Sequence, residues 1–490
     1  MASPTSISSR VERRDSSPSH PFVVPSRAVL GGVGGAAFLG LLTPNPLLTA
    51  GAFLLVPILI RLLWRRGETP ILLFAVLYQW LQVTTRLLYA DIEGVPLGTL
   101  ASYAPPAQVR EATGLGLIGL LVLAGGAHLV LRQLGPSRPL SEWIERFSLW
   151  RLFLLYLALA AYEQFLPAFA GLFGPLSEIL VPAAQTKWVL FFILGYACIQ
   201  REEGYSYLAT AVAIEFVLGI GYFSGFKTVF LFLAVVVFAA QKKLRGRTIA
   251  VAALFAGVLL ILGSIWMSIR GEYRTYLNQG TGQQVVQVSR MERLQKAYTL
   301  ASNVSLQEAV QNVEAVALRL SYVEMFAASL EYVPERRPHS EGEIWGQAVQ
   351  HVLMPRLLFP GKGVLPSDSE LTMKYTGHNL ASGAQGTSIS LGYMAESYID
   401  FGRYLMFVPI LLLGIGWGAL YYFFVTRATI NVVGHGFATA VLFNASRFEM
   451  TSLKLVGGVL TAFIVLALIQ AYVVPQFLHW LLNDSTEAKT

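Results

Sequence analysis

The sequence is poor in charge and almost free of cysteine. Only 13% of its 490 residues are Asp, Glu, Lys or Arg, whereas soluble domains carry roughly 25%. The single cysteine, Cys198, excludes any disulfide within the chain. Cys198 also falls near the predicted cytoplasmic end of a membrane span, which excludes a cysteine protease or sortase-like transpeptidase that acts on the outer face.

Several motifs that mark nucleotide, metal or redox sites are also missing. The sequence has no Walker loop, no HExxH and no pair of CxxC motifs. The stretch GLGLIG at 114–119 has the spacing GxGxxG. It lies in an apolar run and follows no strand, so it predicts close helix packing. We therefore expect no cofactor, no metal ion and no nucleic-acid partner.

Long apolar runs dominate what is present. Hydrophobic residues make up 54% of the chain, and its mean hydropathy is +0.55. Most runs are about 16 to 22 residues long, enough for helices to cross a hydrocarbon core of about 30 Å. They predict an all-α, polytopic integral membrane protein with about twelve spans. The predicted spans are 28–43, 46–63, 71–88, 112–131, 152–167, 187–200, 206–223, 226–241, 248–268, 404–425, 435–448 and 455–474.

The Lys and Arg residues of the short connections indicate the orientation. They gather in alternate connections, at 61–66, 132–151 and 242–247, and such basic loops face the cytoplasm. With about twelve spans, both termini are then cytoplasmic. Residues 1–27 are predicted to be a disordered basic tail and residues 475–490 a second cytoplasmic tail.

The longest connection lies between the ninth and the tenth predicted span. The alternation places residues 269–403 on the outer face as a large periplasmic loop, between membrane domains of residues 28–268 and 404–474. Apolar residues recur at helical spacing across 312–333, which predicts an amphipathic helix there. Arg319 falls on the apolar face of that helix, so we expect it to have an anionic partner.

Cations gather at the predicted outer boundary of the membrane. Guanidinium groups grip phosphate oxygens well, and several cations that face one site predict a pyrophosphate. The alternative for each cation alone is an anchor that reaches to lipid phosphates. The predicted pyrophosphate ligands are Lys227 in SGFK, Arg270 and Arg274 in RGEYR, Arg319, and Arg356 and Lys362 in HVLMPRLLFPGKG, with Arg86 and Arg447 nearby.

These stretches, together with RLSYVE, GHN and GYMAESYIDFG, resemble bacterial Wzy-type polymerases of O-antigen and exopolysaccharide repeat units. The resemblance covers about residues 200 to 450. It implies a glycosyltransferase that joins undecaprenyl-pyrophosphate-linked oligosaccharides on the outer face of the bacterial cytoplasmic membrane, without metal or cofactor. A flippase and a chain-length regulator are the protein partners that it implies.

Glycosyl transfer also needs a base that removes a proton from the acceptor hydroxyl. Glu396, in YMAESYIDFG, is our first candidate, and His378, which resembles the HN of the related O-antigen ligases, is the second. Glu324 is a weaker third. The structural alternatives are a helix-capping or ion-paired glutamate for Glu396 and a turn histidine for His378. A ligase and a flippase or transporter of lipid-linked sugars stay open as other functions.

Overall fold

The computed structural model describes residues 21–100, 102–135, 138–173, 176–222, 225–241, 246–281, 285–354, 359, 361, 366–380 and 388–482. Helices dominate these residues, and the only β-structure among them is two isolated bridges. Seven helical segments are long and apolar enough to cross a membrane. The chain is therefore a helical membrane protein, as the sequence predicts.

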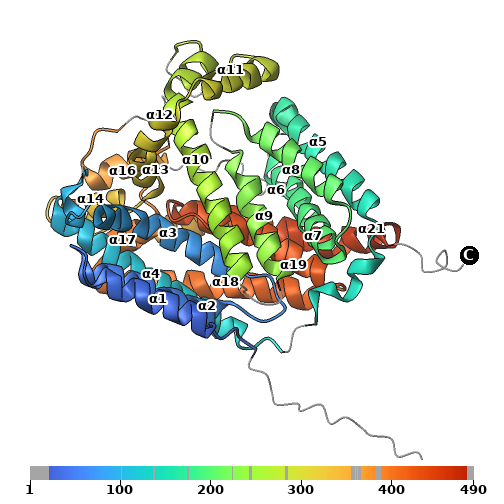
Figure 1. Ribbon diagram of the computed structural model, residues 1–490, viewed down its shortest axis with the longest axis horizontal. Helices are drawn as coiled ribbons and strands as arrows, with labels where there is room; N and C mark the ends of the chain where they lie inside the picture. Colours follow the sequence, from blue (N-terminus) through green and yellow to red (C-terminus); the bar gives the residue numbers. More distant parts are fainter. Residues whose placement is uncertain are drawn as a thin grey trace, which may run out of the picture.

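The first four helices pack together on one side of the molecule (Figure 1). They are α1 Arg27–Gly40, α2 Pro46–Leu63, α3 Ile71–Ile92 and α4 Pro106–Leu131. The described chain already packs before α1, because Phe22 is buried and Val23 N donates to the carbonyl of Trp64 at 2.8 Å. The predicted tail 1–27 therefore includes ordered residues at its end, and residues 1–20 lie outside the described part.

Helix α4 approaches α18 (Phe407–Arg427) very closely. A Cβ at Gly414 would lie 2.1 Å from the carbonyl oxygen of Leu123, and one at Gly126 would lie 2.4 Å from that of Leu411. Glycine lets the two backbones meet, as at other close contacts of membrane helices. Gly119 similarly faces Met394, so the GLGLIG stretch serves helix packing, as predicted.

A second group of helices lies on the opposite side of the molecule (Figure 1). It comprises α5 Leu149–Phe173, α6 Ser177–Ala184, α7 Thr186–Arg201, α8 Tyr205–Gly219 and α9 Lys227–Ala240. Lys187 is buried in this group, where it pairs with Glu163 and, at 2.8 Å, with Glu215.

Helix α10 (Gly246–Leu277) continues well past the predicted end of the ninth span at residue 268. Beyond it come α11 Arg290–Ser302 and α12 Leu306–Gln311, which lie at one end of the molecule (Figure 1). Arg270 and Arg274 are therefore helical residues and do not open a loop.

The amphipathic helix predicted at 312–333 is in fact two helices. They are α13 Val313–Leu320 and α14 Glu324–Tyr332, separated by extended backbone at Ser321. In the break, Tyr322 N donates to the carbonyl of Gln82 on α3 at 3.1 Å. A contact from a distant helix thus replaces the hydrogen bond that would have continued α13.

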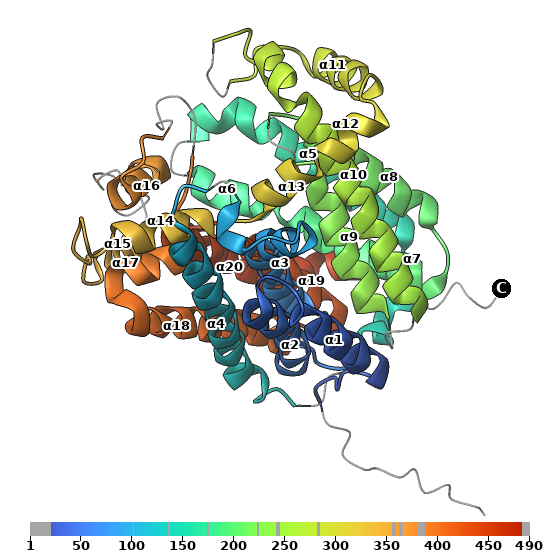
Figure 2. The same cartoon turned by 60° about the vertical axis from the view of Figure 1, so that its left-hand side comes forward.

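The remaining helices complete the bundle. In the view of Figure 2, α14, α15, α16 and α17 lie together on the side away from α7 to α10. Helix α21 ends at Leu481, so the predicted tail boundary at 475 falls inside a helix. These elements are α15 Glu343–Leu353, α16 Asp368–Thr376, α17 Tyr393–Leu405, α19 Asn431–Asn444, α20 Val459–Leu468 and α21 Val474–Leu481, with π-helical turns at Lys454–Gly458 and Ile469–Val473.

Each of the twelve predicted spans overlaps at least one of these helices. The seven segments that meet the length and hydropathy of a span are Pro46–Leu63, Ile71–Ile92, Pro106–Leu131, Leu149–Leu166, Ser177–Arg201, Phe407–Arg427 and Lys454–Leu481. Helices α1, α8 and α9 are apolar but shorter. A membrane crossing by these three, and by α10 and α19, stays a prediction.

Candidate functional site

Five cations from four parts of the chain share one neighbourhood. Lys227 begins α9, Arg270 and Arg274 lie one turn apart on α10, Arg319 is in the last turn of α13, and Arg447 follows α19. We call them the cationic cluster. Arg319 interacts electrostatically with Lys227, Arg270 and Arg274, and Arg447 interacts with Lys227.

The packing of α13 against α10 holds this cluster together. Asn312 donates to Ser268 Oγ at 2.9 Å, and a Cβ at Gly263 would meet Val316 at 3.5 Å. Burial, together with the neighbouring Arg319 and Arg274, lowers the pKa of Arg270. The like charges therefore repel one another, and an anion bound among them would relieve that repulsion.

Arg274 is the member with the most contacts to protein. Its Nε donates to the carbonyl of Tyr222 at 3.3 Å, and its guanidinium lies 4.8 Å from the centre of the Tyr222 ring. Burial is the main reason that the pKa of Arg274 is lowered. Within the described part of the chain, none of the five cations forms an ion pair. The anionic partner expected for Arg319 is thus missing from the described residues.

One carboxylate, that of Glu449, interacts with the cluster through Lys227. The side chain of Gln82 on α3 fixes its position, since Gln82 Nε2 donates to Glu449 Oε2 at 2.6 Å and Gln82 Oε1 accepts from Phe448 N at 2.8 Å. Ser390 Oγ also donates to the carbonyl of Glu449 at 2.6 Å. Sequence reasoning named Arg447 but missed Glu449 and Gln82.

An apolar groove of about 570 Å³ lies next to the cluster. It runs between α3 on one side and α9 and α10 on the other, and Tyr78 and Leu81 line it just before Gln82. On α9 the groove begins at Leu231, one turn after Lys227, and on α10 it reaches Leu259. The site therefore combines a positively charged end with an apolar channel, which suits an amphiphilic anion.

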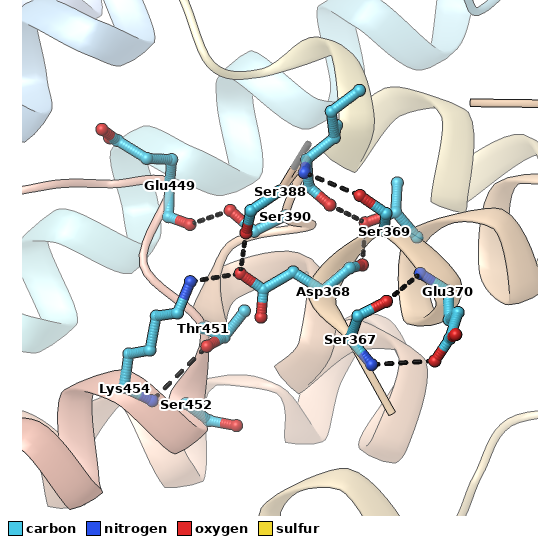
Figure 3. Close-up of polar contacts among 12 residues, drawn as sticks. Ser367, Asp368, Ser369, Glu370, Ser388, Ser390, Glu449, Thr451, Ser452 and Lys454 are labelled. Carbon is cyan, nitrogen blue, oxygen red and sulfur yellow. Dashed lines mark hydrogen bonds and ion pairs between the residues drawn. The ribbon is translucent and has the colours of Figure 1, made fainter. Parts of the chain in front are cut away.

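The segment 447–454 connects the cluster to a second polar network. Lys454 pairs with Asp368 on α16, which also accepts from Ser388 Oγ at 2.7 Å. Figure 3 shows that the Glu449 side chain points away from this network, while its carbonyl faces Ser390. The network holds the segment in place through the contacts of Lys454 with Asp368 and of the Glu449 carbonyl with Ser390.

Glu396 lies beneath this segment and is completely buried. Its Oε2 accepts from Ser452 N at 2.6 Å, and its Oε1 has no hydrogen-bond partner among the described residues. Burial raises the pKa of Glu396 to about 7, against the effect of the Ser452 hydrogen bond. Its role as the base stays a prediction, and a substrate could reach it only if the Ser452 segment moved.

The other two candidate bases lie in different surroundings. His378 follows α16, where its ring lies 5.4 Å from that of Tyr103 and its Nε2 is buried without a partner among the described residues. Glu324 forms an ion pair with the buried Arg86, whose guanidinium also donates to the carbonyl of Leu100 at 2.8 Å. Glu324 and Arg86 thus neutralise each other.

The structure brings together four of the six predicted pyrophosphate ligands. These are Lys227, Arg270, Arg274 and Arg319. Arg356 and Lys362 lie outside the described residues. The motif NASRFE contained a signal for the missed carboxylate, because Glu449 stands two residues from Arg447 in the same short connection.

Comparison with known proteins gives one match. The model of a family described as a domain of unknown function, DUF8712, matches residues 148–487. Searches of curated proteins and of solved structures gave no match. The matched region contains every cation of the cluster, as well as Glu449 and Glu396, whereas α1 to α4 precede it. Because the match covers more than half of the chain, the protein belongs to the DUF8712 family.

Proposed function

We propose that the protein polymerises undecaprenyl-pyrophosphate-linked oligosaccharide repeat units into O-antigen or exopolysaccharide. The observation that carries this proposal is the cationic cluster beside an apolar groove. A polyprenyl pyrophosphate has a matching build, with a strongly anionic group on a long apolar chain. The sequence resemblance to Wzy-type polymerases supports the same substrate class.

The cluster would serve the leaving group of the transfer. When the bond between the sugar and the pyrophosphate breaks, negative charge grows on the pyrophosphate, and fixed cations stabilise it. Arg319 and Arg270 are suited to this task, because neither has a competing ion pair among the described residues. The reaction then needs no nucleotide sugar, since the pyrophosphate is already a good leaving group.

We place this site on the outer face of the bacterial cytoplasmic membrane, in a chain of twelve spans with both termini in the cytoplasm. The basic loops support that orientation. A further support is that the ends predicted to be outside lie together. Arg270 after the ninth span, Lys227 at the start of the eighth and Arg447 at the outer end of the eleventh are neighbours.

The first test measures binding of undecaprenyl pyrophosphate to the purified full chain in nanodiscs. Arg319→Gln removes the cation that interacts with three others, so we expect affinity to fall about 10- to 100-fold, as for loss of a charge-assisted hydrogen bond. Arg336→Gln is the matched control, because Arg336 is an exposed arginine whose guanidinium lies 6.0 Å from the centre of the Tyr332 ring. Equal affinity of the wild type and Arg319→Gln would contradict the proposed site.

The second part of the test follows the product. A strain that lacks this gene should accumulate lipid-linked single repeat units, and the wild-type chain should restore polymer there. Restored attachment of preformed polymer, without any change in its length, would identify a ligase. Passage of the lipid across the membrane without any new glycosidic bond would identify a flippase.

A further inference from the structure

The proposed reaction needs a group that accepts the proton of the attacking hydroxyl, and the acidic residues around the segment 447–454 can be compared for this task. Most are already engaged. Asp400 accepts from Ser340 Oγ, Ile344 N and Trp345 N, at 2.6 to 3.1 Å. Asp368 pairs with Lys454, and Glu370 caps α16. Glu396 is sealed under the Ser452 segment.

Glu449 differs from all of these. It is only partly buried, and it interacts with a cation of the cluster. One carboxylate oxygen is held by Gln82, whereas no described residue donates a hydrogen bond to the other, Oε1. A hydroxyl of a bound acceptor sugar can therefore take the position that the protein leaves open.

The support around Glu449 is rigid. Gln82 is buried on α3 and binds both the carboxylate and the backbone NH of Phe448. Gly392 lies directly against the same segment, since a Cβ there would be 2.8 Å from the carbonyl oxygen of Phe448. A base that is fixed from two sides can be aligned with its substrate before the reaction begins.

We propose that Glu449 is the catalytic base of the transfer. This inference rests on the proposed function. The Oε1 atom takes the proton of the acceptor hydroxyl while the acceptor oxygen forms a bond to the anomeric carbon of the donor sugar. The bond between that carbon and the pyrophosphate oxygen breaks, and its electron pair leaves with the pyrophosphate, whose charge the cationic cluster balances. Glu449 then releases the proton to water.

The test uses Glu449→Gln in the purified full chain. Glutamine can still accept the hydrogen bond from Gln82 but cannot take up a proton. We expect undecaprenyl pyrophosphate to bind at least as tightly as to the wild type, because a negative charge is lost from the cationic cluster. Turnover of the lipid-linked repeat unit, isolated from the deletion strain, should fall about 10²- to 10⁴-fold. The matched control is Glu314→Gln on α13, an exposed glutamate.

A second variant guards against simple misfolding. Glu449→Asp keeps a carboxylate but shortens the side chain, so it should recover part of the turnover that Glu449→Gln loses. If Glu449→Asp were no more active than Glu449→Gln, although both bind undecaprenyl pyrophosphate, Glu449 would not be the base.

Two further outcomes separate this inference from the proposed function. If Glu449→Gln binds undecaprenyl pyrophosphate more tightly than the wild type, and its turnover of the repeat unit stays within threefold, then Glu449 is only a counter-ion. The inference would then be wrong. A wild-type chain that does not bind undecaprenyl pyrophosphate would instead overturn the proposed function itself.

Discussion

At the scale of single residues, two glutamates on either side of one segment have opposite surroundings. Glu449 lies near cations and is partly open, whereas Glu396 is 0% exposed and lies near Asp368 and Asp400. Burial and these two neighbouring carboxylates favour the neutral form of Glu396. The structure therefore suggests different tasks for two side chains of the same type.

Glu396 should make the stability of the protein depend on pH. Burial raises the pKa of Glu396 from 4.5 to about 7, so the folded state binds more protons than the unfolded state between these values. Stability consequently falls as the pH rises through this window, by at most about 3 kcal/mol. Glu396→Gln removes the dependence. Thermal unfolding in detergent should show that the unfolding temperature of the variant rises relative to that of the wild type as the pH increases from 5 to 8.

The same measurement has a clear opposite result. If the unfolding temperatures of Glu396→Gln and the wild type differ by a constant amount from pH 5 to pH 8, Glu396 does not titrate in this range. Turnover of the variant provides a second reading, because near-normal turnover would remove Glu396 from the candidate bases.

At the scale of helices, the close contact between α4 and α18 depends on glycine. Gly414→Ala would insert a methyl group where the carbonyl oxygen of Leu123 already lies, at 2.1 Å. We expect the helices to separate and the protein to lose about 1 to 3 kcal/mol of stability, as in overpacked cores. Gly416→Ala is the control on the same helix, since nothing lies within 4 Å of its Cβ position.

Thermal unfolding of both alanine variants in the same detergent would check this prediction. Gly416→Ala should unfold at or slightly above the wild-type temperature, because alanine favours the helix over glycine. An equal effect of both substitutions would show that helix propensity, and not the contact with α4, governs the result.

For the whole molecule, the sequence predicted where the helices lie but not how far they extend. Apolar runs mark the part of a helix that a membrane or core covers. Helix α10 continues for nine residues beyond its run because Ile269, Tyr273 and Leu277, spaced four residues apart, pack into a separate apolar cluster with Phe226 and Trp266. The break between α13 and α14 was not predictable, since it depends on a bond from Tyr322 to Gln82. That contact is visible only after folding.

The candidate site shows the same division. Lys227, Arg270 and Arg274 could be assigned to it because they stand at the ends of apolar runs, and the ends of neighbouring spans meet at one membrane face. Arg319 could be assigned because it falls on the apolar face of an amphipathic stretch. The pairing of Gln82 with Glu449 could not be found in this way, because Gln82 is one polar residue within an apolar helix. Nothing in the sequence relates it to a residue more than three hundred positions later.

The orientation of the chain gives the last prediction. Reporters fused after Arg66 and after Arg138 should report the cytoplasm, because Lys and Arg concentrate in the connections at 61–66 and 132–151. A reporter at Ser340 should report the outside. Activity of a periplasmic reporter such as alkaline phosphatase and of a cytoplasmic one at each site would check this. A cytoplasmic signal at Ser340 would place the cationic cluster on the wrong face for the proposed reaction.

The unbroken course of α10 has a consequence for the lipid around the protein. One helix carries both Leu259 in the apolar groove and Arg270 in the cationic cluster, eleven residues and about 16 Å apart along its axis. The depth at which the cations lie is thus fixed relative to the groove. A thicker or thinner bilayer would change the depth at which it holds the pyrophosphate of the substrate, whereas the depth of the cations stays fixed. The site is therefore matched to one membrane thickness.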